Sequence, residues 1–355
     1  MADLHPEATE LLDELGRRNL PPSAALSPAG ARAALREVLI ERGPEIEVGR
    51  VRQFPIEKPG DSGDPSGDLA LRCYEPDEDG RGNWADGSIP ILVYYHGGGW
   101  VRGDLDTHDE LCRYFTSELG CLTVAVEYRR APEHSFPAAA EDAYAALRWV
   151  GEHTPVFGAD SRTIAVAGDS AGGNLATVAA LAARDRGGPD LRHQVLLYPA
   201  TDHAFDTDSY DAHAENPMLS RATMKWYWEH YLSRAFDGAH PYASPLRARD
   251  LDGLPSATVI TAATIRSGTR EKPTPIGWQG PASRPLMPTM GGCSTRSSPS
   301  RRSNARTRRA SRSWALSGRP SGTVGDRTPA AIARPLVIVG TGDHPHRNPV
   351  LDTVP

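Results

Sequence analysis

The alternation of strand-sized and helix-sized segments between residues 91 and 198 restricts the fold more than any other feature of the sequence. Short apolar segments, typical of strands, cover residues 91–95, 122–128, 163–167 and 195–198. Segments of helix length lie between them, at residues 108–119, 138–150 and 171–183. Strands and helices that alternate in this way form a mostly parallel, doubly wound sheet with helices on both faces. We therefore expect an α/β protein, and 355 residues are enough for one large domain of this kind.

The flanking segments add further expectations. Residues 1–45 are predicted to form helices, and Ser27-Pro28 is typical of a helix start. The aromatic-rich segment 200–240 interrupts the alternation and is expected to lie over the edge of the sheet. One more strand is predicted at residues 257–261, after which the regular pattern ends.

The segment Gly168-Asp169-Ser170-Ala171-Gly172 matches the G-x-S-x-G pattern of a nucleophile elbow. A predicted strand precedes it and a predicted helix follows, which is the context that the pattern requires. The turn is so tight that larger side chains at Gly168 and Gly172 would collide. It would lift the Ser170 hydroxyl above the sheet, at the N-terminus of a helix. The pattern alone is common by chance, so its place between strand and helix carries the prediction.

A second glycine-rich element follows the strand predicted at residues 91–95: His96-Gly97-Gly98-Gly99-Trp100. A turn of three glycines leaves backbone N–H groups free to point at an oxygen atom, as an oxyanion hole for acyl transfer requires. The donors that we expect are the N–H groups of Gly98, Gly99 and Ala171. The alternative is a flexible loop without a function of its own, but two such elements in this order favour a serine hydrolase.

These motifs resemble the hormone-sensitive-lipase-like family of α/β-hydrolase esterases, in particular its bacterial G-D-x-G group. Further matching segments are Tyr128-Arg129-Arg130-Ala131-Pro132-Glu133-His134, Phe136-Pro137-Ala138-Ala139, Leu197-Tyr198-Pro199 and Ser244-Pro245-Leu246. The resemblance covers about residues 70–261. It implies an α/β-hydrolase fold with its core at residues 46–262, over which residues 1–45 and the segment 200–240 form a helical cap.

The resemblance also implies the chemistry. Ser170 would be the nucleophile, a histidine its general base, and an acidic residue would orient that histidine. His96 would brace the glycine turn through hydrogen bonds and is not the catalytic histidine, and Asp169 would fix the loops around the nucleophile. The implied substrate is a small-molecule, short-chain acyl ester, with neither a metal ion nor an organic cofactor.

The acid and the base of the family are missing from their expected positions. The family carries the acid in a D-P-L-x-D-E-G segment after the last strand named above, and the base in a later Y-x-G-x-x-H-G-F segment. Here no histidine follows His240 until His344. Residues 1–262 contain 24 Lys and Arg against 41 Asp and Glu, whereas residues 263–355 contain 15 against 4. We expect residues 263–355 to be a basic, disordered tail, which leaves the C-terminal strand and helix units missing.

A shift of the reading frame explains this tail. If each codon is built from the last base of one codon and the first two of the next, residues 264–271 permit Asp-Pro-Leu-Arg-Asp-Glu-Gly. In the same frame residues 289–298 permit Tyr-Gly-Gly-Met-Phe-His-Glu-Val-Phe. These strings match the acid and base segments of the family. Our hypothesis is an inserted or deleted nucleotide near codon 262 or 263, either in the gene or in its determined sequence.

An esterase that is impaired by the missing acid and base has three alternatives. Asp343 with His344 or His346 would give the order nucleophile, acid, base along the chain. In this fold, however, the acid and the base follow two different strands. We therefore favour a solvated terminal loop for these residues over a catalytic role. The protein could also bind a small ligand without turning it over. The arginine-rich tail could bind nucleic acid, but it lacks interleaved aromatic residues and replaces a part that the fold needs, so we expect no nucleic acid partner.

The composition excludes other classes. Hydrophobic residues make up 39% and charged residues 24%, as in ordinary globular proteins. The longest apolar runs are strand-sized, so no stable membrane insertion is expected. The N-terminus lacks the basic and apolar regions of a signal peptide, and the four cysteines show no C-x-x-C spacing. We therefore expect a reduced, cytoplasmic protein, whose oligomeric state these patterns do not fix.

Overall fold

Seven strands form one sheet in the order β1-β2-β4-β3-β5-β6-β7. They are β1 (Arg50–Ile56), β2 (Leu69–Glu75), β3 (Ile89–Tyr95), β4 (Leu122–Glu127), β5 (Ala159–Asp169), β6 (Leu191–Leu197) and β7 (Ala257–Ile260). The computed structural model describes residues 6–40, 46–57, 59, 69–77, 89–216 and 219–261, all within one unit of the chain. In the part of the sheet ordered β4-β3-β5-β6-β7, neighbouring strands run parallel. The mostly parallel sheet expected from the alternation is therefore confirmed.

The sequence analysis predicts neither strand β1 nor the antiparallel pairing of β2. β1 pairs antiparallel with β2, and β2 pairs antiparallel with β4. Most β1 side chains are exposed or half-buried, since this strand lies at the edge of the sheet. An edge strand that alternates Arg50 and Arg52 with apolar residues and contains Pro55 lacks the apolar run by which buried strands are recognised.

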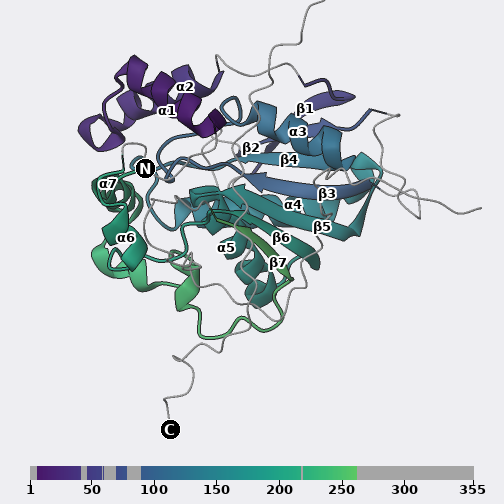
Figure 1. Ribbon diagram of the computed structural model, residues 1–355. Coiled ribbons are helices and arrows are strands. Elements are labelled where there is room, and N and C mark those ends of the chain that lie inside the picture. The colour runs from purple at the N-terminus through teal and green to yellow at the C-terminus, as the bar shows by residue number, and fades with distance from the viewer. Residues whose placement is uncertain are drawn as a thin grey trace, which may run out of the picture. The chain divides into compact units, whose positions relative to one another are not determined.

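Helices cover both faces of the sheet. The longer ones are α1 (Pro6–Arg18), α2 (Pro28–Ile40), α3 (Asp109–Leu119), α4 (Ala138–His153), α5 (Ala171–Arg186) and α7 (Arg221–Tyr231). α4 and α5 contact β3 and β5, whereas α3 contacts β2 and β4 (Figure 1). Along β3 the side chains alternate: Ile91, Val93 and Tyr95 belong to the apolar cluster that includes α4 and α5, and Leu92 and Tyr94 to the cluster that includes α3. Nearly all of β3 and β4 is buried, as in parallel sheets covered on both sides.

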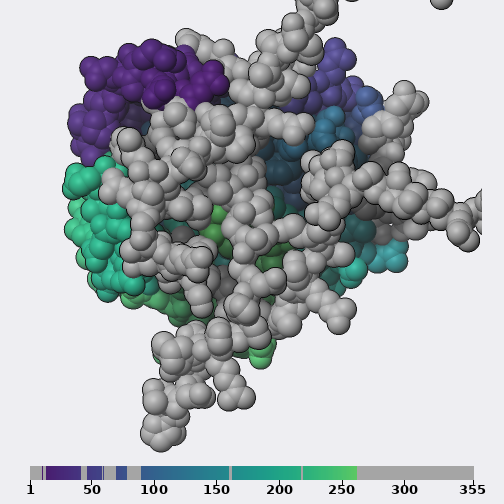
Figure 2. All heavy atoms as spheres, viewed as in Figure 1, coloured from purple at the N-terminus to yellow at the C-terminus, as the bar shows by residue number. Residues whose placement is uncertain are grey.

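Helices α1 and α2 lie next to α7 at one end of the sheet, and α6 (Asp208–Ala212) lies on the far side of α7 (Figure 1). The space-filling view shows the two groups side by side on the surface (Figure 2). α2 begins at Pro28 as predicted, and Ser27 Oγ accepts the Gly30 N–H at 3.2 Å. The segments predicted as a cap therefore meet, while the division of the chain into cap and core stays a prediction. The predicted tail, residues 263–355, lies outside the described residues.

No helix in the described part of the chain has the length and apolar character needed to cross a bilayer.

Candidate active site

Ser170 lies at the turn between β5 and α5, where the motif predicts it. Its backbone has φ 53° and ψ −116°, a conformation that costs a non-glycine residue energy and is typical of functional turns. The turn is as tight as expected, because a Cβ atom on Gly168 would lie 2.3 Å from the Gly172 carbonyl carbon. The strained serine therefore depends on the glycines around it.

Backbone hydrogen bonds hold this turn in place. The Ser170 N–H donates to the Leu197 carbonyl at 2.8 Å, and the Ser170 carbonyl accepts the Ala200 N–H at 3.0 Å. Asn174 Nδ2 donates to the carbonyls of Ala200 and Ala243, which ties α5 to the same region. The Ser170 hydroxyl forms no hydrogen bond with any other described residue. The backbone of Ser170 is thus fixed, while its hydroxyl is bound by none of the other residues that the structure describes.

The glycine turn follows β3 directly. Gly98 has φ +117°, which residues with a side chain rarely adopt, and its carbonyl accepts the N–H of Arg102 at 2.9 Å. Within the described residues the N–H groups of Gly98 and Gly99 donate to no protein atom. The N–H of Ala171 is free for a different reason, because it belongs to the first turn of α5. In the described part of the chain, all three predicted donors are therefore without an acceptor.

Asp169 joins the glycine turn to the elbow. Its Oδ1 accepts the Gly97 N–H at 2.7 Å and the Tyr94 hydroxyl at 2.5 Å, and lies 3.5 Å from His108 Nε2. Burial opposes charge on this carboxylate, but His108, the Tyr94 hydroxyl and His96 together outweigh burial and hold the pKa of Asp169 below its ordinary value. Burial likewise opposes charge on His108, and Asp169 nevertheless raises the pKa of His108 above 6.5. The two side chains lie together behind the turn, and each favours the charged form of the other.

His96 is buried beside the same turn. Its Nδ1 lies 2.9 Å from the Gly97 carbonyl, and its ring stacks on Tyr128 with centroids 4.2 Å apart. Tyr128 donates its hydroxyl to the His96 carbonyl at 2.7 Å. Burial, with His108 nearby, lowers the pKa of His96 to about 3, so the ring is neutral. The bracing role implied by the resemblance stays a prediction, and these are contacts that would serve it.

Tyr94 and His108 were not identified as site residues from the sequence. Tyr94 is separated from Asp169 by 75 positions, and His108 reaches Asp169 from the loop before α3. Their burial beside a carboxylate is visible only after the strands have paired. Asp343, His344, His346 and the segments proposed to be out of frame lie outside the described residues. Within the residues described, no three His, Cys, Asp or Glu side chains gather as a metal site would require.

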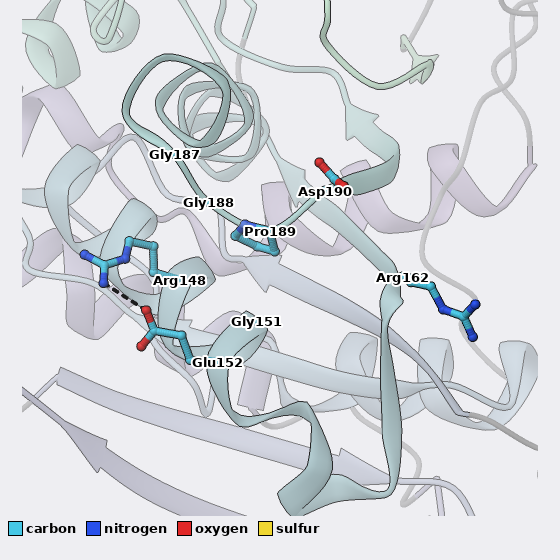
Figure 3. Close-up of a pocket in the computed structure, with 8 residues that line it drawn as sticks. All are labelled: Arg148, Gly151, Glu152, Arg162, Gly187, Gly188, Pro189 and Asp190. Atoms are coloured by element: carbon cyan, nitrogen blue, oxygen red, sulfur yellow. Dashed lines mark hydrogen bonds and ion pairs between the residues drawn. The ribbon is translucent and has the colours of Figure 1, made fainter.

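A groove of about 420 Å³ lies at the other end of the sheet. It is lined by Arg148, Gly151, Glu152, Arg162, Gly187, Gly188, Pro189 and Asp190 (Figure 3). These residues come from the ends of α4 and α5 and the beginnings of β5 and β6, whereas Ser170 follows the end of β5. Ligands of such sheets bind beyond the carboxyl ends of the strands. The groove is therefore separate from the candidate active site.

Comparison with known proteins places these motifs in a family. A family model for the alpha/beta hydrolase fold matches residues 92–265. Carboxylesterase NlhH of Mycobacterium tuberculosis is 39% identical over 235 residues, which are 65% of this chain and 70% of NlhH. Carboxylic ester hydrolase LipN of the same organism is 42% identical over 226 residues, which are 62% of this chain and 56% of LipN. The chain thus spans little more than half the length of LipN.

Solved structures agree with this. An esterase from the hyperthermophilic archaeon Pyrobaculum calidifontis superposes with a TM-score of 0.65 at 38% identity, over 73% of this chain and 79% of that one. A thermostable esterase from Pseudomonas putida gives a TM-score of 0.66 at 37% identity, over 74% and 79%.

Proposed function

Because the chain belongs to the hormone-sensitive-lipase-like family of the α/β-hydrolase fold, we propose that its site is that of a serine carboxylesterase for short-chain acyl esters. The observation that carries the proposal is the hydrogen bond from the Gly97 N–H to Asp169. It ties the glycine turn to the residue next to Ser170. A strained serine and free backbone donors are thereby held together, which is what acyl transfer needs.

The reaction follows from this arrangement. Ser170 Oγ attacks the ester carbonyl carbon, and the negative charge that forms on the carbonyl oxygen is stabilised by the N–H groups of Gly98, Gly99 and Ala171. A general base takes the Ser170 proton and passes it to the alcohol oxygen as the C–O bond breaks, which releases the alcohol and leaves the acyl group on Ser170. Water attacks this acyl-enzyme in the same way and releases the acid. Backbone N–H groups stabilise the oxyanion directly, so this step requires no cofactor.

The chain is proposed to carry out this reaction poorly. A base must take the proton from Ser170, yet in the described residues no histidine is hydrogen-bonded to its hydroxyl. The family places the acid and base after β7, where this sequence departs from it, and the family match ends at residue 265. Loss of triad residues lowers kcat by about four to six orders of magnitude. We therefore propose that an inserted or deleted nucleotide near codon 262 or 263, in the gene or in its determined sequence, accounts for the missing acid and base.

Two measurements test this function. Sequencing the gene across codons 250–300 decides whether the shift is present in the gene. Hydrolysis of p-nitrophenyl butyrate by the full chain, with Ser170→Ala as control, decides whether Ser170 reacts. Weak hydrolysis that disappears in Ser170→Ala supports the proposal, whereas equal rates in both would refute it.

A second candidate function follows from the missing base: a protein that keeps the pocket and binds a small ligand without turnover. It predicts saturable binding of a short-chain ester with no release of nitrophenol. The esterase predicts an initial burst followed by turnover once the reading frame is restored.

A further inference from the structure

Arg102 is a half-buried cation beside the glycine turn, and no acidic side chain among the described residues pairs with it. Its backbone N–H closes the turn by donating to the Gly98 carbonyl at 2.9 Å. Its Nη1 donates to Ser23 Oγ at 2.8 Å. Burial lowers the pKa of Arg102 below its ordinary value, and no described carboxylate forms an ion pair with it. The guanidinium therefore relies on neutral partners.

Tyr227 is the second of these partners. Its ring centroid lies 5.2 Å from the Arg102 guanidinium carbon, and its hydroxyl donates to Ser23 Oγ at 3.2 Å. The ring also packs on the glycine turn, because a Cβ on Gly99 would lie 2.3 Å from its atoms. Ser23, Arg102 and Tyr227, here called the Ser23 cluster, thus connect the segment between α1 and α2, the glycine turn and α7 (Figure 1).

The cluster has an energetic cost. Arg102 Nε is buried and has no hydrogen-bond partner within the described residues. A half-buried cation loses part of its hydration, and its hydrogen bonds and ring contacts must compensate for that loss. A residue present only to fill space would be apolar, so the charge and the donors of Arg102 need another explanation.

A second arginine attaches the same N-terminal segment to the same loop. Arg32 of α2 donates from Nε to the Val101 carbonyl at 2.8 Å and from Nη2 to the Ala131 carbonyl at 2.9 Å. Its guanidinium also pairs with Glu133 at 2.6 Å. Two arginines therefore tie the N-terminal helices to the residues that immediately follow the glycine turn.

We propose that Arg102 is a positioning residue that holds the Ser23 segment and the Tyr227 ring against Gly98 and Gly99. The direction of these two N–H groups then depends on the N-terminal helices being in place. The inference rests on the proposed function only for the use of those N–H groups. Displacement of the N-terminal helices would loosen the oxyanion turn while the sheet stays folded.

Hydrogen exchange of the full-length protein, followed by mass spectrometry, tests this proposal. Arg102→Met keeps the bulk and removes the donors, and Arg102→Lys restores a charged donor. We expect Arg102→Met to speed exchange at least tenfold in residues 19–27 and 97–103, with little change in α5, and Arg102→Lys to recover much of the protection. Arg148→Met, which removes an exposed arginine paired with Glu152 on α4, is the matched control.

Unchanged exchange in Arg102→Met, equal exchange in the Met and Lys variants, or equally faster exchange in α5 would overturn the proposal. If Arg102→Met does not fold, Tyr227→Phe tests the proposal instead. This change removes the hydrogen bond to Ser23 and keeps the ring on Gly99. It should speed exchange severalfold in residues 19–27, and no change there would be contrary evidence. None of these measurements needs ester hydrolysis, so a failure of the esterase proposal would be seen separately.

Discussion

The Asp169 carboxylate accepts the Gly97 N–H at 2.7 Å and thereby links the residue before Ser170 to the first glycine of the glycine turn. The same oxygen accepts the Tyr94 hydroxyl and faces His108. One buried carboxylate thus fixes the distance between the two motifs that the proposed reaction needs. The following predictions depend on that link and on the turn that it holds.

Replacing Asp169 by alanine should destabilise the fold. The change leaves the Gly97 N–H and the Tyr94 hydroxyl without their acceptor and His108 without its partner. Breaking a buried ion pair in this way costs about 3–5 kcal/mol. The midpoint of urea unfolding should fall accordingly, while Asp190→Ala, at an exposed position in the remote groove, should change it little. A midpoint unchanged in Asp169→Ala would mean that the link is not needed.

The ion pair between His108 and Asp169 should make stability depend on pH. The pKa of His108 is raised, so its contribution is complete below 6.5 and is lost as the pH rises through the folded-state value. The pKa of Asp169 is lowered, so its contribution is present above 3.8 and is lost as the pH falls through its own folded-state value. The native protein should therefore exceed His108→Gln in stability by most at pH values between 3.8 and 6.5, the ordinary pKa values of the two groups.

Thermal unfolding of both proteins from pH 4 to pH 9 measures this difference. His153→Gln, at the end of α4, controls for the loss of an imidazole elsewhere. A constant difference between the native protein and His108→Gln across the range would contradict the ion pair.

Gly98→Ala should disable the oxyanion turn. Its φ of +117° disfavours a side chain, and the added Cβ would lie 2.4 Å from the Arg102 carbonyl oxygen. In a protein with the reading frame restored, kcat for p-nitrophenyl butyrate should fall by about 10²–10³, as when an oxyanion donor is lost, with a smaller change in KM. Gly16→Ala, where no atom lies within 4 Å, should leave kcat unchanged. Equal kcat in the two variants would refute the role of the turn.

The sequence was most informative where chemistry and backbone geometry coincide. Gly168 and Gly172 flank a serine, and the elbow could be predicted because this pattern lies between a predicted strand and a predicted helix. The apolar runs of β3 and β4 were found because parallel strands buried on both faces carry few polar residues. Strand β1 was missed because an edge strand with Arg50, Arg52 and Pro55 has no such run.

The supporting contacts of the site could not be predicted, because they join distant parts of the chain. Tyr227 meets Ser23 across 204 positions, and Arg32 meets Glu133 across 101. No local pattern marks such pairs before the elements have packed. The position of Asp169 beside Ser170, by contrast, predicts that it fixes the surrounding loops. Which residues it contacts could be known only from the folded structure.

The most direct test compares ester hydrolysis by the protein with hydrolysis by a version whose reading frame is corrected near codon 262, so that it encodes the Asp-Pro-Leu and histidine segments. The predicted result is a kcat/KM for p-nitrophenyl butyrate at least about 10⁴-fold higher in the corrected protein, abolished in both by Ser170→Ala. Comparable kcat/KM values in the two proteins would contradict the claim that this chain has lost the acid and the base of its triad.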